Sequence, residues 1–309
     1  MSELLQIFID VIVPIFLIVG AAFWVGRRLN PDIRSLSTVL IYLFIPALSF
    51  RTMIRLPIDG VQDVVTGEFG RAFAQIALLV AIMWVVAAVV GRMLKLDRRT
   101  GSAFTLSITQ INAGNLGIPL NTFAFGAVGS EMALLYYVSS AIIGAVTGVF
   151  IASRGQKSVM GALWNVIRVP ASTSALLGLA LNVFDVAMPL PLDRAISLLG
   201  DGTIPGMIVL LGLLISRIRI RHAPWKLVSL AALIRLFGGA AIGVALAQVL
   251  GVTGIQYNVA VLQSAVPTAV MANALAAEFG SDAEFTSAAT LVGTLASIGT
   301  LTLWIALLR

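Results

Sequence analysis

The chain has 309 residues, of which 59% are hydrophobic and 11% charged, and its net charge is +6. A soluble domain has about 45–50% apolar and about 25% charged residues, so this composition excludes a soluble globular protein. The apolar runs are continuous rather than alternating, which excludes a β-barrel and indicates an all-α polytopic protein of the lipid bilayer. The chain has no cysteine, one histidine and no GxxxxGK[ST] sequence, so we expect no metal, no cofactor and no ATP-driven chemistry.

Hydropathy predicts ten membrane-spanning helices in chain order. They cover about residues 5–26, 33–53, 71–91, 102–125, 131–152, 168–186, 191–215, 226–249, 256–277 and 284–307. Residues 1–152 form a first predicted five-helix repeat, 153–167 a linker, and 168–309 a second repeat. Because each repeat has an odd number of spans, the second is expected to be inverted relative to the first.

Basic residues collect in alternate short loops, for example in 92–99 and 217–226. Short loops rich in lysine and arginine face the cytoplasm. We therefore expect both termini on the outer side, which is the periplasmic side of a bacterial inner membrane. The positive charge marks this topology and does not indicate a nucleic-acid partner.

Two proline-interrupted spans occupy the fourth position of each half: TLSITQINAGNLGIPL at 105–120 and VAVLQSAVPTAVMANAL at 259–275. Each is followed by a predicted Gly-Ser-acid turn, at 129–131 and 280–282. A proline frees backbone carbonyls that lipid cannot satisfy, so such a break survives only inside protein or beside a polar cavity. A single proline often kinks a membrane helix without any ligand. Breaks at matching positions of two halves instead indicate a ligand site.

If the two breaks cross, two half-helix N-termini face one point, and their free N–H groups suit an anion. Neutral amide and hydroxyl side chains would add hydrogen bonds. The candidate binding residues are Asn112, Asn115, Gly117, Pro119, Gln263, Ser264, Pro267 and Thr268, with Tyr42 as a weaker candidate.

Two ionisable residues fall inside predicted spans, Asp201 and Arg235. Charged side chains are costly at this depth and face protein or water. They could carry a proton or form a gate, or they could form structural hydrogen bonds and ion pairs. The sequence leaves both readings open.

Motifs along essentially the whole chain resemble the auxin efflux carrier family, which includes plant auxin carriers and bacterial malonate- or malate-type carriers. The matching motifs are Asn30-Pro31-Asp32 with Phe44–Phe50, Asn112 with Gly117-Ile118-Pro119, Arg168-Val169-Pro170, Asp201 with Leu211-Gly212-Leu213, Arg235-Leu236, and Ala260–Pro267. Plant auxin carriers have an asparagine after the proline that matches Pro170, whereas this chain has Ala171. The difference argues against an auxin-like substrate.

The resemblance implies ten helices in two inverted halves, with elevator-type transport. Spans one, two, six and seven would form a scaffold that holds a homodimer, and the other six would carry the crossing breaks. Asn112 would bind a substrate carboxylate, with the backbone near Pro267 and Thr268 completing the site.

The expected function is therefore secondary active or facilitative transport of a small carboxylate, and not catalysis. A sodium-coupled symporter of the bile-acid type is the alternative, but sodium is usually bound with a carboxylate nearby and neither break contains one. A membrane sensor or receptor would be a different class, and we would expect it to carry a signalling domain.

Overall fold

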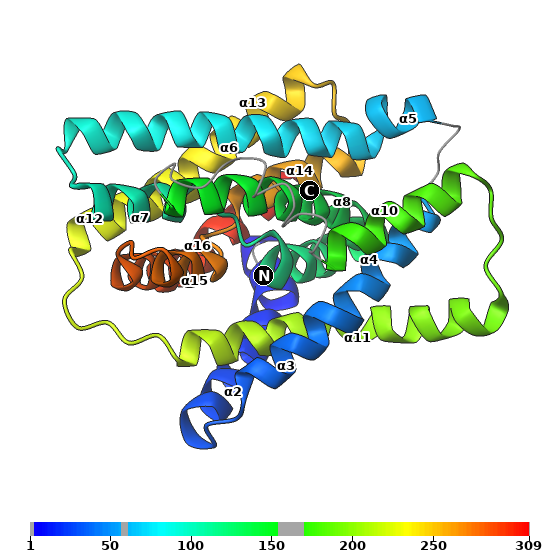
Figure 1. Cartoon of the computed structure of the whole chain (residues 1–309), viewed down its shortest axis with the longest axis horizontal. Helices are drawn as coiled ribbons and strands as arrows, with labels where there is room; N and C mark the ends of the chain where they lie inside the picture. Colours follow the sequence, from blue (N-terminus) through cyan, green and yellow to red (C-terminus); the bar gives the residue numbers. More distant parts are fainter. Residues whose placement is uncertain (1–2, 57–60, 154–169, 309) are drawn as a thin grey trace.

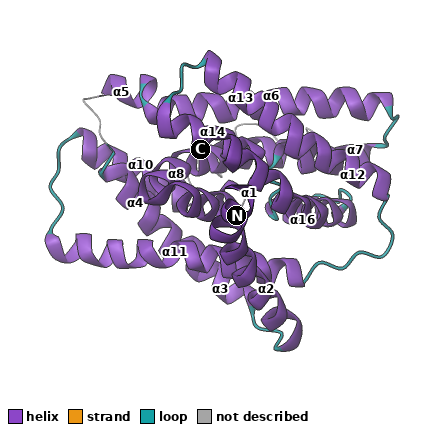
Figure 2. Ribbon diagram, turned by 180° about the vertical axis from the view of Figure 1, so that it is seen from behind, coloured by secondary structure: helices purple, strands orange, loops and turns teal. Residues whose placement is uncertain are grey.

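The computed structural model describes residues 3–56, 61–153 and 170–308, which form a bundle of helices (Figure 1). No strand occurs among these residues, and a single β-bridge within them joins Ile111 to Thr268. Helices make up the opposite face as well (Figure 2). The predicted all-α class is confirmed, whereas residues 154–167 of the predicted linker lie outside the described part of the chain.

Most helices lie within the predicted spans, although α8 joins the end of the predicted fourth span to the fifth and four short π-helical turns lie inside spans of the described chain. The elements up to residue 153 are α1 (Glu3–Ile7), η1 (Phe8–Ile12), α2 (Val13–Arg28), α3 (Ile33–Val39), η2 (Leu40–Phe44), α4 (Ile45–Ile54), α5 (Val61–Thr66), α6 (Glu68–Met93), α7 (Arg98–Thr109), η3 (Ala113–Gly117) and α8 (Ile118–Ala152). Those from residue 170 are α10 (Pro170–Val183), α11 (Leu190–Ser216), α12 (Trp225–Leu233), η4 (Ile234–Gly238), α13 (Gly239–Val249), α14 (Gly254–Ala265), α15 (Met271–Glu278) and α16 (Ala283–Leu308).

Prolines account for three of these π-helical turns. The turns η1, η2 and η3 each end two residues before a proline, at Pro14, Pro46 and Pro119. A proline has no N–H, so the regular hydrogen-bond ladder loses one bond there, and a widened turn lets the chain continue as a helix. The turn η4 has no proline and contains Arg235, which is described below.

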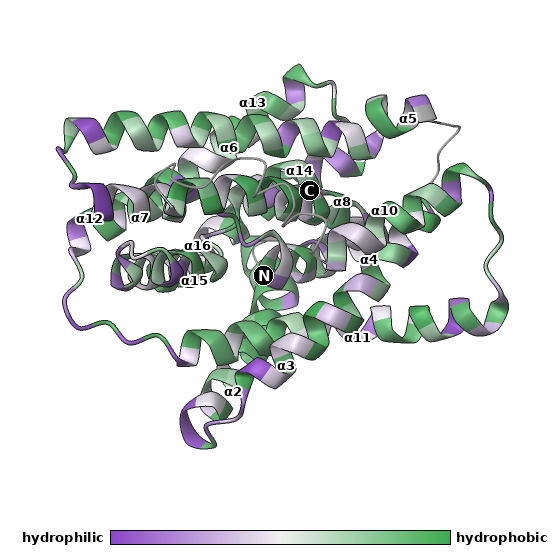
Figure 3. Cartoon of the chain, in the orientation of Figure 1, coloured by the Kyte–Doolittle hydropathy of each residue, from purple (hydrophilic) through white to green (hydrophobic). Residues whose placement is uncertain are grey.

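Seven helices among the described residues are long and apolar enough to cross a membrane. They are Leu4–Arg28, Ile33–Ile54, Glu68–Met93, Ala113–Ala152, Leu190–Ser216, Trp225–Val249 and Ala283–Leu308. The predicted fourth and ninth spans are broken, so α7 and α14 have 12 residues each, and the described part of the sixth, α10, has 14. The count of ten spans and their inverted repeat therefore stay predictions. Hydrophilic residues gather in the loops that follow α2 and α6 (Figure 3).

One predicted turn lies elsewhere. Residues 129–131 are helical, and the kink within α8 is instead at Gly126, where φ is 69° and ψ is −154°. Gly129 packs against the helical turn before this kink, because a Cβ atom there would lie 2.6 Å from the Asn121 carbonyl oxygen. The second predicted turn is where we expected it, since Gly280 has a φ of 68° between α15 and α16.

The helices pack in two groups. In the first, α10 lies along α4, and α11 packs against both α2 and α4. In the second, α6 packs against α7 and α8, α13 against α14, and α12 against α16. The groups meet where α11 contacts η3 and α8, and where α10 and α4 contact α8. The η3 turn, which belongs to the broken fourth span, is thus placed at the boundary between the groups.

Candidate functional site

The two broken spans meet in the middle of the bundle. Residues 110–112 and 266–270 interrupt the helices, and we call these two segments the crossover. The Asn112 N–H donates to the Pro267 carbonyl at 2.9 Å, and the Ala269 N–H donates to the Gln110 carbonyl at 2.9 Å. These bonds flank the bridge between Ile111 and Thr268. Each break therefore satisfies backbone groups that the other has freed, which is how both survive in an apolar bundle.

Side chains and glycines fix this arrangement. The Thr268 hydroxyl donates to the Ser107 carbonyl at 2.6 Å, which ties the second break to α7. The Gln263 amide donates to the carbonyls of Ala133 at 3.1 Å and Ala113 at 3.4 Å. Gly117 makes room for that amide, because a Cβ atom at 117 would lie 2.3 Å from the Gln263 Oε1 atom. The glycine in the motif is thus needed for close approach of a side chain.

The helix ends at the crossover divide into two kinds. Two helices, α7 and α14, end there and present carbonyl groups. Two others, the η3–α8 helix and α15, begin there and present N–H groups. A helix end carries about half an elementary charge, negative at the C-terminus and positive at the N-terminus. One crossover therefore offers both a place for a cation and a place for an anion.

Arg235 occupies the place for a cation. Its side chain is 1% exposed, and its Nη1 atom donates to the Ile108 carbonyl in α7 at 3.1 Å. Its Nη2 atom donates to the Ser264 carbonyl in α14. The two ion pairs found among the described residues, Arg51–Asp201 and Arg55–Asp193, do not include Arg235. The carbonyl ends of both broken helices are therefore the partners of this buried cation.

Two residues of the crossover carry buried amide donors without a partner. The Asn112 Nδ2 atom and the Gln110 Nε2 atom have no hydrogen-bond acceptor among the described residues, and neither has the Arg235 Nε atom. Asn112 is 3% exposed and Gln110 7% exposed. Leaving a buried donor unpaired costs about 1–3 kcal/mol. A ligand with acceptor oxygens would remove this cost. The Gln263 Oε1 and Asn121 Oδ1 acceptors are also unpaired.

Gln110 is a candidate site residue that the sequence reasoning missed. Its side chain lies against α8, because Cβ atoms at Gly144 and Gly148 would each lie 2.9 Å from its amide group. The glycine pair, spaced four residues apart, forms a slot for this amide. The available signal was a carboxamide directly before Ile111-Asn112 at the end of the broken helix.

Most predicted site residues come together, but not all. Gly117, Pro119, Gln263, Ser264, Pro267 and Thr268 are buried around the crossover with Asn112. Asn115 is half-buried in η3, at the boundary with α11. Tyr42 in η2 is 62% exposed, and the structure does not bring it to the crossover.

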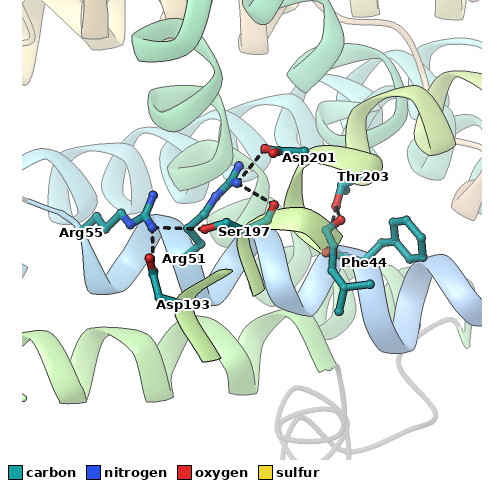
Figure 4. Close-up of polar contacts among 8 residues, drawn as sticks. Phe44, Arg51, Arg55, Asp193, Ser197, Asp201 and Thr203 are labelled. Carbon is teal, nitrogen blue, oxygen red and sulfur yellow. Dashed lines mark hydrogen bonds and ion pairs between the residues drawn. The ribbon is translucent and has the colours of Figure 1, made fainter. Parts of the chain in front are cut away.

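Asp201 lies apart from the crossover, in a polar cluster between α4 and α11 (Figure 4). Arg51 pairs with Asp201 at 2.7 Å and also donates to the Ser197 carbonyl at 2.9 Å. Arg55 pairs with Asp193 at 2.6 Å. Of the two readings of Asp201, the structure supports the ion pair.

The chain is similar to known transport proteins. The family model described as membrane transport protein matches residues 7–305. An uncharacterized transporter of Methanothermobacter thermautotrophicus is 25% identical over 88% of this chain and 88% of its own. A Rhizobium meliloti protein named "Putative malonate transporter" is 26% identical over 89% of this chain and 86% of its own. The chain therefore belongs to the membrane transport protein family, which is the auxin efflux carrier family, and is a multi-pass membrane transporter.

Proposed function

We propose that the protein carries a small carboxylate across the membrane at the crossover, by secondary active or facilitative transport. The observation that carries the proposal is the set of unpaired donors on Asn112 and Gln110, buried where two helix N-termini begin. An anion accepts from such donors and is stabilised by the helix dipoles. The similarity to the Rhizobium meliloti protein supports a carboxylate such as malonate as the first compound to test.

The mechanism we propose is an elevator. The first packing group, α2, α4, α10 and α11, would be the scaffold and would hold a homodimer in the membrane. The second group carries the crossover and would slide along it. The contact between η3 and α11 supports this division, because η3 directly follows residues 110–112 of the crossover and would lie at the proposed sliding boundary.

The experiment is a thermal-shift titration of the purified protein in detergent. Binding to the folded state raises the melting temperature as ligand concentration passes its Kd. Malonate is expected to raise it and malonamide, which has the same shape without charge, is not. Uptake of labelled malonate into proteoliposomes then measures transport. Equal shifts with both compounds, or no shift with any short carboxylate, would contradict the proposal.

A further inference from the structure

We propose that Arg235 is a built-in substitute for a coupling cation, so that the crossover binds its anion without sodium. This inference rests on the proposed carboxylate site and says what balances the charge there. In transporters with broken helices, a sodium ion is held by unwound carbonyls and by the C-terminal ends of half-helices. In this chain the guanidinium group of Arg235 binds those ends.

The charges balance without any acidic residue. Each helix C-terminus carries about −0.5 elementary charge, so the ends of α7 and α14 together offset about one positive charge. The guanidinium supplies that charge and reaches both ends at once, through the Ile108 and Ser264 carbonyls. A planar group with several donors in a fixed fork suits two separate carbonyls better than a lysine ammonium would. A buried, unpaired arginine is otherwise costly, so its role as a fixed cation explains how it is tolerated.

The helix that carries Arg235 is shaped to admit its head group. A Cβ atom at Gly239 would lie 2.2 Å from the Arg235 Nη2 atom and 2.6 Å from the Ser264 carbonyl oxygen. Gly243, one turn later, faces Ser264 in the same way, with a Cβ position 2.3 Å from the serine Cβ. The two glycines therefore bring α13 close to the end of α14. Gly238 differs, because a Cβ there would meet only Ile234, at 3.8 Å.

A cation that belongs to a side chain makes binding independent of the sodium concentration, whereas a bound sodium ion does not. A coupling ion contributes free energy because it binds and leaves, whereas a side chain is present in every state. Wild-type protein is therefore expected to have one melting temperature and one carboxylate affinity in sodium, potassium and choline buffers. Arg235→Ala removes the cation and leaves two carbonyl ends around a vacated space. We expect it to weaken carboxylate binding about ten- to hundredfold in choline, and we expect sodium to restore part of that affinity and to raise its melting temperature.

Three further variants make the test decisive. Arg235→Lys keeps the charge and is expected to stay indifferent to sodium, with a weaker effect on affinity than Arg235→Ala. Gly239→Ala displaces the guanidinium and is expected to lower both the melting temperature and the affinity, whereas Gly238→Ala is the matched control and is expected to lower neither.

The inference is overturned if Arg235→Ala binds the carboxylate as well as wild type does in choline and does not respond to sodium. If that variant cannot be purified, the two glycine variants provide the test. Equal melting temperatures and equal carboxylate affinities of Gly239→Ala and Gly238→Ala would contradict the inference. A wild-type protein that binds no carboxylate would refute the proposed function instead. The sodium response of the Arg235→Ala melting temperature would still test the role of the guanidinium.

Discussion

Replacing Asn112 with alanine should separate binding from folding. The backbone of Asn112 makes the bonds that hold the crossover: its N–H donates to Pro267 at 2.9 Å, and its carbonyl accepts from Gly117 at 3.0 Å. Alanine keeps both. The side-chain Nδ2 atom is buried without a partner, so the unliganded protein loses no bond from that atom when it is removed.

Asn112→Ala is expected to affect the stability of the unliganded protein and its affinity for the carboxylate in opposite directions. An unpaired buried donor costs about 1–3 kcal/mol, so its removal offsets the packing lost with the side chain. The melting temperature of Asn112→Ala should thus be unchanged or slightly higher. In the complex, however, a hydrogen bond to a charged ligand is lost. Such a bond contributes about 1.5–3 kcal/mol, which corresponds to a ten- to hundredfold rise in Kd.

Asn182→Ala is the matched control. The Asn182 amide donates to the carbonyls of Met53 at 2.8 Å and Leu56 at 2.7 Å, where α4 ends, in the packing group away from the crossover. Its loss should lower the melting temperature and leave the Kd unchanged. Both quantities come from thermal unfolding in detergent with and without malonate. The reasoning is refuted if Asn112→Ala binds like wild type, or if it melts as early as Asn182→Ala.

Two predictions concern acidic residues away from the crossover. Asp201→Asn keeps an acceptor for Arg51, which also donates to the Ser197 carbonyl. The pH profile of uptake should therefore match that of wild type. A flattened profile would instead identify Asp201 as a proton carrier. Asp97 begins α7, and hydrogen bonds, first from the Thr100 side chain and then from the Thr100 and Arg99 N–H groups, hold its pKa below the ordinary 3.8. Because this pKa is lowered in the folded state, the stability that the Asp97 carboxylate contributes is complete above pH 3.8 and is lost as the pH falls. Below pH 3.8 the melting temperature of wild type should therefore fall more steeply with pH than that of Asp97→Asn. Parallel plots of melting temperature against pH would contradict this prediction.

The sequence predicted the breaks because proline acts locally. Pro119 and Pro267 each remove a donor, and the structure has a break before each of them. The meeting of the two breaks was a conditional expectation, and the bridge between Ile111 and Thr268 confirms it. Gln110 was missed because the direction of its side chain depends on a glycine slot in α8, more than thirty residues further along the chain.

The partners of the ionisable residues could not be predicted from the sequence. Arg235 bonds a carbonyl 127 positions away, and Asp201 pairs with an arginine 150 positions away. Backbone carbonyls are present at every position and leave no signal in a sequence. The packing of η4 against α7 and α14 selects the Ile108 and Ser264 carbonyls as the partners of Arg235.

The charges at the crossover bear on the energy source of transport. A gradient drives accumulation only when its ion binds one conformational state more tightly than another. Arg235 is the one charged residue among the buried polar side chains of the described chain, and it is tethered. If Arg235 fills the cation place as proposed, the described residues of the crossover offer neither a sodium site nor a titrating carboxyl to couple a gradient. On the proposed function, this arrangement favours facilitative movement of the anion down its own electrochemical gradient.

Uptake into proteoliposomes should then follow an imposed membrane potential with the sign of the substrate charge and stop at equilibrium. Accumulation above equilibrium, driven by a pH or sodium gradient at zero potential, would show that a coupling group lies elsewhere in the chain.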